Sequence, residues 1–249
     1  ETKDPAGQLK APNGIRFRKE PDGLTRSIIS DLLAERDEKK KRRNSYPFGS
    51  PEFVVYDLQQ NVLKVIMNTY YGVSGYTRFR LYDRDIGAAI TSVGRAIIEH
   101  TRKVIEGMGY HVIYGDTDSC MVHLPGESLE ETIADARKVE KEVNASYAGF
   151  AREELSADTH YFSIKFEKVY ARFFQAGKKK RYAGNLVWKE GARVDEIDIV
   201  GFEIRRSDYP QITKAVQLRV IELILRGEGY EAVKANDVEG VVSSILVGQ

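Results

Sequence analysis

Apolar residues recur with a helical period in two neighbouring stretches near the start of the chain. The first stretch covers residues 24–43, where charged residues surround the apolar positions Leu24, Ile28, Ile29, Leu32 and Leu33. Two prolines and a glycine in residues 44–53 end that helix. A second helix is predicted from about Pro51 to Tyr71, with an apolar side made of Phe53, Val54, Leu58, Val62, Val65 and Ile66. The short turn between the two helices predicts an antiparallel helical hairpin.

Helices and strands are mixed over the rest of the chain. Residues 1–22 predict an extended lead-in, and residues 84–109 predict a longer third helix that ends at a glycine. The other predicted elements are a strand–turn–strand over 110–126, a charged helix over 128–156, aromatic-rich strands and turns over 160–187, a strand over 196–206 and a helix over 212–227. Because strand and helix do not alternate regularly, this order favours an α+β fold over a doubly wound α/β fold.

Composition and charge narrow the class of protein only slightly. Hydrophobic residues make up 42% and charged residues 30%, as in ordinary globular proteins, and the net charge is +1. Overall charge therefore does not indicate a nucleic-acid partner, although the basic runs at 36–43 and 177–181 do so locally, with a solvated surface as the alternative. The single cysteine, Cys120, excludes a disulfide within the chain and favours a reducing compartment. No apolar run is long enough to cross a membrane.

The sequence YGDTDS at residues 114–119 carries the clearest chemical signal. It lies between two short apolar stretches, so Val112 and Ile113 are expected to bury one strand of a hairpin, and Met121 and Val122 the other. The turn between these strands would project its two carboxylates outward from the end of the hairpin.

Asp116 and Asp118 are two residues apart, and side chains at this spacing on an extended chain point to the same side. Two close carboxylates repel each other unless a cation lies between them. Mg²⁺ suits such a site, since it takes one or two carboxylates together with substrate phosphates. A plain turn is the alternative for a bare Asp-x-Asp, and an unrelated metal-dependent nucleotidyl or glycosyl transferase is another.

Three motifs together resemble those of family B DNA polymerases, particularly the archaeal ones. YGDTDS resembles the carboxylate motif of the palm domain in that family. KVIMNTYYG at 64–72 is similar to the fingers motif, and KKRY at 179–182 is similar to a palm element near the thumb. They occur in the order that the family has, and GFEIRRSDY at 201–209 follows as expected at the start of a thumb.

The resemblance implies a right-hand polymerase fold in the α+β class. Residues 1–22 would be a lead-in segment, 23–73 the helical hairpin of the fingers, 74–204 the palm with an antiparallel sheet, and 205–249 the start of a helical thumb. The implied activity is DNA-templated DNA synthesis by a DNA-directed DNA polymerase, in which two metal ions assist nucleotidyl transfer to a primer 3′-OH.

The same resemblance implies roles for the acidic residues. Asp118 would be a direct ligand of both Mg²⁺ ions, and Asp116 would be a more distant carboxylate or an occasional ligand. Thr117 would be structural. Glu167, in FEKVY, is a candidate third acidic group near the metals, although a surface carboxylate is an equal alternative.

The fingers motif implies a nucleotide-binding face. Lys64, Asn68 and Tyr71 follow at i, i+4 and i+7, which places them on one side of a helix. Lys64 would contact the triphosphate, Asn68 would hydrogen-bond near it, and Tyr71 would pack by the sugar and the new base pair. Gly72 would allow the backbone to approach that base pair closely. A solvated stripe is the alternative.

The first helix would add two cations to that face. By the resemblance, Arg36 and Lys40 grip the β- and γ-phosphates, and Arg36 can do so through two hydrogen bonds. Lys39 and Lys41 compete with Lys40 for its role.

The basic palm element implies contacts with primer–template DNA. Lys180 and Tyr182 would touch the duplex near the primer 3′ end. Lys179 and Arg181 would point the other way along a strand and serve the phosphate backbone. A basic β-turn is the alternative.

One palm motif of the family is missing from these residues. It carries the second bridging aspartate in a stretch like Asp-x-x-Ser-Leu-Tyr-Pro-Ser, and no such stretch occurs in the chain. Two explanations are a small subunit of a split polymerase and a fragment, and the split subunit is favoured. The expected partners are then primer–template DNA, deoxynucleoside triphosphates and a large N-terminal subunit with an exonuclease and the first palm motif, with a sliding clamp as a further candidate.

Two further expectations follow from the missing motif and the motifs present. The chain alone should be inactive or nearly so, since one aspartate cluster does not hold both metals. A cytoplasmic, nucleoid-associated location without membrane contact is expected. A non-catalytic DNA-binding or scaffold relative that keeps the fold is the alternative, and the set Asp116, Asp118, Lys64, Asn68 and Tyr71 argues against it.

Overall fold

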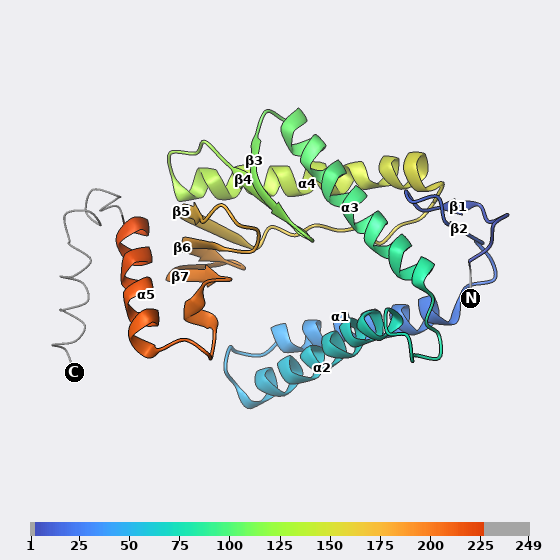
Figure 1. Cartoon of the computed structure of the whole chain (residues 1–249), viewed down its shortest axis with the longest axis horizontal. Coiled ribbons are helices and arrows are strands. Elements are labelled where there is room, and N and C mark those ends of the chain that lie inside the picture. Colours follow the sequence, from blue (N-terminus) through green and yellow to red (C-terminus); the bar gives the residue numbers. More distant parts are fainter. Residues whose placement is uncertain (1–2, 227–249) are drawn as a thin grey trace. The chain divides into compact units, whose positions relative to one another are not determined.

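The computed structural model describes residues 3–226 (Figure 1). The chain divides into two compact units. The first unit comprises Glu1–Lys103 and Ala145–Phe162, and the second comprises Val104–Asn144 and Ser163–Gln249. Helices α3 (Arg84–Gly107) and α4 (Leu129–Leu155) each contribute residues to both.

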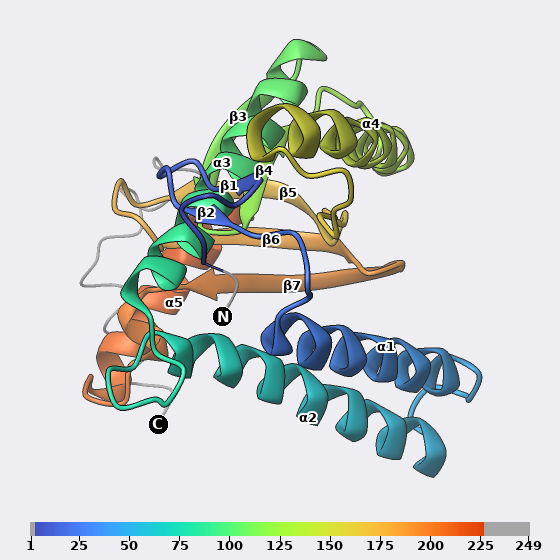
Figure 2. The same cartoon turned by 90° about the vertical axis from the view of Figure 1, so that its right-hand side faces the viewer.

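The first unit contains the predicted helical hairpin. Helix α1 (Leu24–Asn44) and helix α2 (Pro51–Ser74) run side by side in both views (Figures 1 and 2). Helix α2 begins where the sequence predicts, because Ser50 accepts a hydrogen bond from the Phe53 backbone N–H at 3.2 Å and Pro51 occupies the first turn. The hairpin prediction is confirmed.

Most of the apolar side predicted for α2 is exposed, although the ring of Phe53 contacts the Arg43 guanidinium of α1. Leu58 is 61% exposed and Val65 is 63% exposed, whereas Gln60 and Leu63 are buried. The α1 helix is rich in charged residues, so the contact between the two helices relies partly on polar groups. Arg43 of α1 pairs with Asp57 of α2 at 2.8 Å.

The lead-in has more structure than the sequence predicts. Strands β1 (Leu9–Lys10) and β2 (Arg16–Phe17) pair as an antiparallel hairpin within the segment that the sequence predicts only as an extended lead-in. Lys3 Nζ lies 2.7 Å from a carboxylate oxygen of Asp83 and 3.0 Å from one of Asp85. These ion pairs attach the lead-in to the residues that begin α3.

Helices α3 and α4 pack through a buried polar contact in the first unit. The hydroxyl groups of Thr101 and Tyr147 lie 2.8 Å apart, and both residues are almost fully buried. His100 Nε2 lies 2.8 Å from Ser146 Oγ, and its ring packs against Phe150 at 4.7 Å.

The second unit holds two separate antiparallel sheets. Strands β3 (His111–Asp116) and β4 (Ser119–His123) form a hairpin, and β5 (Lys168–Gln175), β6 (Tyr182–Lys189) and β7 (Ala192–Val200) form a sheet in that order. All of these pairings are antiparallel, which confirms the α+β class.

The C-terminal part of the described chain covers this sheet. Strand β7 ends at Val200, so the strand predicted to continue to residue 206 is wrong there, and the short helix η1 (Glu203–Arg205) follows instead. Helix α5 (Gln211–Leu225) packs through Ile221 and Leu225 on a core formed with Ala183, Ile199 and Phe202.

The division into lead-in, fingers, palm and thumb stays a prediction, and residues 227–249 of the predicted thumb lie outside the described residues. Among residues 3–226, none of the helices has the length and apolar character required to span a bilayer.

Candidate active site

The two aspartates lie at the tip of the β3–β4 hairpin. Strand β3 ends at Asp116 and β4 begins at Ser119, so Thr117 and Asp118 form a two-residue turn. The Asp118 backbone N–H donates to the Asp116 carbonyl at 2.6 Å, and the Ser119 hydroxyl donates to the same carbonyl at 3.2 Å. Thr117 has a φ of 51°, an uncommon backbone conformation for a β-branched residue. The turn is therefore tight.

The backbone between Asp116 and Asp118 is not extended, because Thr117 takes the left-handed conformation. The prediction that both carboxylates point to one side of an extended strand is therefore wrong in its premise. Asp116 is the last residue of a strand and is half-buried, whereas Asp118 belongs to the turn and is exposed. The pair still shares one hairpin tip.

The strand that leads to the aspartates also buries a different residue from the one expected. Ile113 is 44% exposed and faces a cavity of about 860 Å³ whose walls include Met121 and Val139. Tyr114 is buried instead. Side chains alternate along β3, so Val112, Tyr114 and Asp116 lie on its more buried side and Ile113 lies on the opposite, exposed side.

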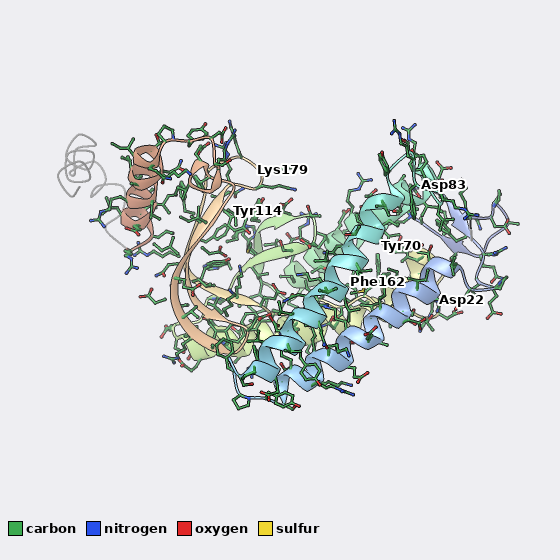
Figure 3. All side chains as sticks on the ribbon, turned by 90° about the horizontal axis from the view of Figure 1, so that it is seen from below. Asp22, Tyr70, Asp83, Tyr114, Phe162 and Lys179 are labelled. Atoms are coloured by element: carbon green, nitrogen blue, oxygen red, sulfur yellow. The ribbon has the colours of Figure 1, made fainter. Side chains whose placement is uncertain are left out.

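The basic element KKRY is a turn followed by a strand. Lys179 and Lys180 form the turn and strand β6 begins at Tyr182, so the predicted alternation along one strand is wrong at residues 179–181. Lys180 has a φ of 63°. Its backbone N–H donates to the Tyr114 hydroxyl at 2.8 Å, and Figure 3 shows the neighbouring Lys179 on this turn.

Gly201 packs closely against the backbone of the same turn. A Cβ atom added at Gly201 would lie 1.7 Å from the Lys180 carbonyl oxygen, so no other residue fits without movement of the backbone. The Lys180 backbone is therefore fixed on one side by Tyr114 and on the other by the chain that leaves β7.

Aromatic rings join the aspartate hairpin to the basic turn. The ring of Tyr114 lies 5.7 Å from that of Tyr182, and Phe173 lies 5.4 Å from Tyr182. Burial, followed by the negative charge of Asp198, raises the pKa of Tyr182, and Asp116 adds to this effect. The two motifs thus form one connected site within the second unit.

Arg181 has a partner in the protein itself. Its guanidinium lies 2.9 Å from the carboxylate of Glu203, and the Gln217 side chain donates to that carboxylate at 2.8 Å. This contact links the basic turn to η1 and α5. A role for Arg181 on a DNA phosphate stays a prediction.

The carboxylates fit part of a magnesium site. Asp116 and Asp118 supply hard oxygen ligands at an accessible hairpin tip, which is the donor type that Mg²⁺ prefers. Across residues 3–226, no group of three or more His, Cys, Asp or Glu side chains is arranged to hold a metal ion. Glu167, exposed and directly before β5, does not complete such a group with the two aspartates, and its metal role stays a prediction.

The predicted nucleotide-binding residues belong to the first unit. Lys64, Asn68 and Tyr71 are exposed along α2, and Gly72 follows them in the same helix. Arg36 and Lys40 lie one turn apart on α1 and are half-buried. The structure therefore places these two sets on the two helices of one hairpin, and the aspartates in the other unit.

A polar network crosses the hairpin at Arg36. Arg36 Nε donates to Gln60 Oε1 at 3.3 Å, and Gln60 Nε2 donates to Asp57 Oδ1 at 3.2 Å. Sequence reasoning missed Gln60, Asp57 and Tyr114 as contributors to the site. Asp57 and Gln60 are three residues apart on one helix, a spacing that the sequence does show. The contacts of Gln60 with Arg36 and of Tyr114 with Lys180 join distant segments, and no spacing along the chain signals them.

Comparison with known proteins shows the family to which the chain belongs. Residues 8–247 match the family model of DNA polymerase family B. The chain belongs to DNA polymerase family B. The matched residues include every motif described above, from Arg36 to the GFEIRRSDY segment at 201–209.

Relatives in this family come from archaea. The chain is 35% identical to DNA polymerase 2 of Aeropyrum pernix, and the match covers 95% of this chain and 26% of the relative. It is 33% identical to a DNA polymerase of Archaeoglobus fulgidus, and that match covers 88% of this chain and 25% of the relative. The structure of the family B DNA polymerase from the hyperthermophilic archaeon Pyrobaculum calidifontis matches the whole chain with a TM-score of 0.66 and 31% identity, over 28% of that polymerase. The chain thus spans about a quarter of the length of these family B relatives.

Proposed function

We propose that the chain forms part of a polymerase active site that adds deoxynucleotides to a primer 3′-OH under the direction of a DNA template. The observation that carries this proposal is the link between the aspartate hairpin and the basic turn through Tyr114 and Lys180. It joins a carboxylate pair suited to Mg²⁺ with a cationic turn suited to DNA, within a chain of DNA polymerase family B. The similarity to an archaeal family B polymerase supports a right-hand fold with fingers, palm and the start of a thumb.

Asp116 and Asp118 would hold Mg²⁺ in this reaction. When bound, Mg²⁺ neutralises charge on the triphosphate and lowers the pKa of the attacking 3′-OH. Asp118 is the more exposed of the two and would approach the metals most directly, with Glu167 as a candidate third carboxylate. The tight turn at Thr117 would keep the two carboxylates at a fixed spacing.

The remaining residues would position the two substrates. Lys179, Lys180 and Tyr182 would contact primer–template DNA near the 3′ end, and Lys180 is presented by a backbone fixed on two sides. A nucleoside triphosphate would bind along the hairpin helices of the first unit. Its proposed contacts are Arg36, Lys40, Lys64, Asn68, Tyr71 and Gly72.

A further carboxylate is needed to complete the metal site. Two aspartates leave several Mg²⁺ positions open, and Glu167, the candidate third carboxylate, does not complete a metal-holding group with them within residues 3–226. We propose that residues outside these 249 provide it, either from the same polymerase or from a separate large subunit with an exonuclease. A sliding clamp is a further candidate partner.

Primer extension tests the proposal directly. One reaction holds the chain with a primer–template, Mg²⁺ and four deoxynucleoside triphosphates. A second adds a polypeptide that carries the missing palm motif. Extension is expected only in the second reaction. Extension by the chain alone would contradict the proposed need for an outside carboxylate, and no extension by a complex shown to form would contradict polymerase function and favour a DNA-binding scaffold.

A further inference from the structure

We propose that Gln60 and Asp57 are positioning residues that aim the Arg36 guanidinium at a triphosphate. This inference rests on the proposed function, since it assigns Arg36 a phosphate to bind. It concerns the first unit alone, where α1 supplies Arg36 and α2 supplies the other two residues.

Gln60 lies at the centre of the contact between the two helices. It is 5% exposed, although glutamine usually lies at the surface, and both ends of its amide have partners. Its Oε1 accepts from Arg36 Nε at 3.3 Å, and its Nε2 donates to Asp57 Oδ1 at 3.2 Å. A buried amide that bonds at both ends holds one orientation, because losing either bond leaves a buried polar group unpaired.

Asp57 determines that orientation. An ionised carboxylate only accepts hydrogen bonds, so the amide NH₂ of Gln60 must face it and the amide oxygen must face Arg36. Asp57 receives further bonds from Arg43 Nη1 at 2.8 Å and Asn61 Nδ2 at 3.1 Å. The hydrogen bond from Arg43 is the main reason that the pKa of Asp57 lies below its usual value, which keeps the carboxylate ionised.

The hydrogen bond with Gln60 determines which edge of the Arg36 guanidinium is available to a phosphate. With Nε held by Gln60, the two Nη groups form the edge that can bind a phosphate through two parallel hydrogen bonds. Among residues 3–226, no carboxylate forms an ion pair with Arg36. A guanidinium already held in position loses less conformational freedom when it binds a ligand, which favours affinity.

Binding of inorganic tripolyphosphate to the full chain, measured by calorimetry, tests this inference independently of primer extension. Arg36→Ala and Gln60→Ala should each weaken binding, Gln60→Ala by about tenfold, the loss expected for a hydrogen bond to a charged group. The matched control is Gln59→Ala, which removes an exposed glutamine from the neighbouring position of α2 and should leave the affinity unchanged.

The double variant Arg36→Ala/Gln60→Ala separates positioning from a general structural role. If Gln60 acts through Arg36, the double variant should bind tripolyphosphate as weakly as Arg36→Ala alone. The inference would be overturned if the loss of affinity in the double variant equalled the product of the losses in the two single variants. Wild-type affinity in Gln60→Ala, or an absence of tripolyphosphate binding by the wild-type chain, would also overturn it. A complex that fails to extend a primer while this non-additivity holds would contradict the proposed function but leave the role of Gln60 intact.

Asp57→Asn tests the part played by Asp57. An amide at position 57 can offer Gln60 either a donor or an acceptor, so the orientation of the Gln60 amide is no longer fixed and tripolyphosphate affinity should fall. The matched control is Asp37→Asn, which removes an exposed carboxylate next to Arg36 on α1 and should not lower the affinity. Wild-type affinity in Asp57→Asn, with the variant folded by circular dichroism, would overturn the proposed orientation by Asp57.

Discussion

The Tyr114 hydroxyl accepts a hydrogen bond from the backbone N–H of Lys180, 2.8 Å away. The two residues are far apart in sequence, and each belongs to a separate motif. Tyr114 lies two residues before Asp116, and Lys180 lies at the centre of the basic turn. This bond gives the carboxylate pair and the proposed DNA contact a fixed relationship within the second unit.

Tyr114→Phe removes only that hydroxyl. The ring contacts with Tyr182 and Phe173 remain, so the fold should persist while the Lys180 backbone N–H loses its hydrogen-bond acceptor. We expect the free energy of unfolding to fall by about 1 kcal/mol, the usual cost of one hydrogen bond. We also expect the KM for primer–template to rise. Urea unfolding of the chain and the KM for primer–template in the complete polymerase measure these two effects.

The matched control for this change is Tyr76→Phe. Tyr76 is 54% exposed, so removing its hydroxyl should leave both the stability and the primer KM unchanged. Equal unfolding stability and equal primer–template KM in Tyr114→Phe and Tyr76→Phe would show that the Tyr114 hydroxyl does not position the basic turn.

Gly201→Ala should strain the contact between β7 and the basic turn. The added Cβ would lie 1.7 Å from the Lys180 carbonyl oxygen, and the φ of 72° disfavours any side chain. A loss of about 3 kcal/mol in the free energy of unfolding is expected, as for other changes that force a backbone to move. Gly177→Ala serves as the control, because Gly177 has a similar φ of 67° but no atom within 4 Å of the added Cβ. A Gly201→Ala loss no larger than this control would contradict the close approach.

Leucine truncation tests which face of α2 packs. Leu63 is 8% exposed and Leu58 is 61% exposed, although both lie on the same helix. Leu63→Ala should cost about 2 kcal/mol or more in stability, whereas Leu58→Ala should cost less than about 0.5 kcal/mol. The two values come from chemical unfolding of the chain, and a reversal of their order would restore the face predicted from the apolar pattern.

The pH dependence of stability should contain a contribution from His100. Burial, together with the nearby charge of Lys103, lowers the pKa of this imidazole in the folded protein. The unfolded chain then binds a proton more readily, so stability should fall as pH drops below about 6.5 and level off below the folded pKa. His100→Phe should flatten this part of a melting-temperature profile between pH 8 and pH 5, whereas the exposed His111→Phe should not.

Much of the helical architecture follows from the sequence. The hairpin of α1 and α2 follows from helical periodicity broken by Pro47, Gly49 and Pro51. The sequence also shows where α3 ends, because Gly109 directly follows the apolar pattern and takes a φ of 88°. These features depend on residues that are close together in the chain.

The site geometry follows less well, because it depends on local irregularities and distant contacts. The apolar character of Ile113 predicted its burial, but Ile113 lies on the exposed side of β3 and Tyr114 on the buried side. The sequence also predicted a strand through residues 179–182, whereas Lys180 takes a left-handed conformation that Tyr114 and Gly201 support from other segments. Neither support can be recognised from the residues next to Lys180.

The measurement that tests the central claim most directly is primer extension by the complete polymerase carrying Asp118→Asn. This change keeps the size of the side chain but removes its charge, so extension should fall on the order of a thousandfold or more while binding to primer–template persists. Asp195→Asn, an exposed change on β7, should extend as the wild type does. Wild-type extension by Asp118→Asn in Mg²⁺ would contradict the claim that the aspartate hairpin forms part of the catalytic metal site.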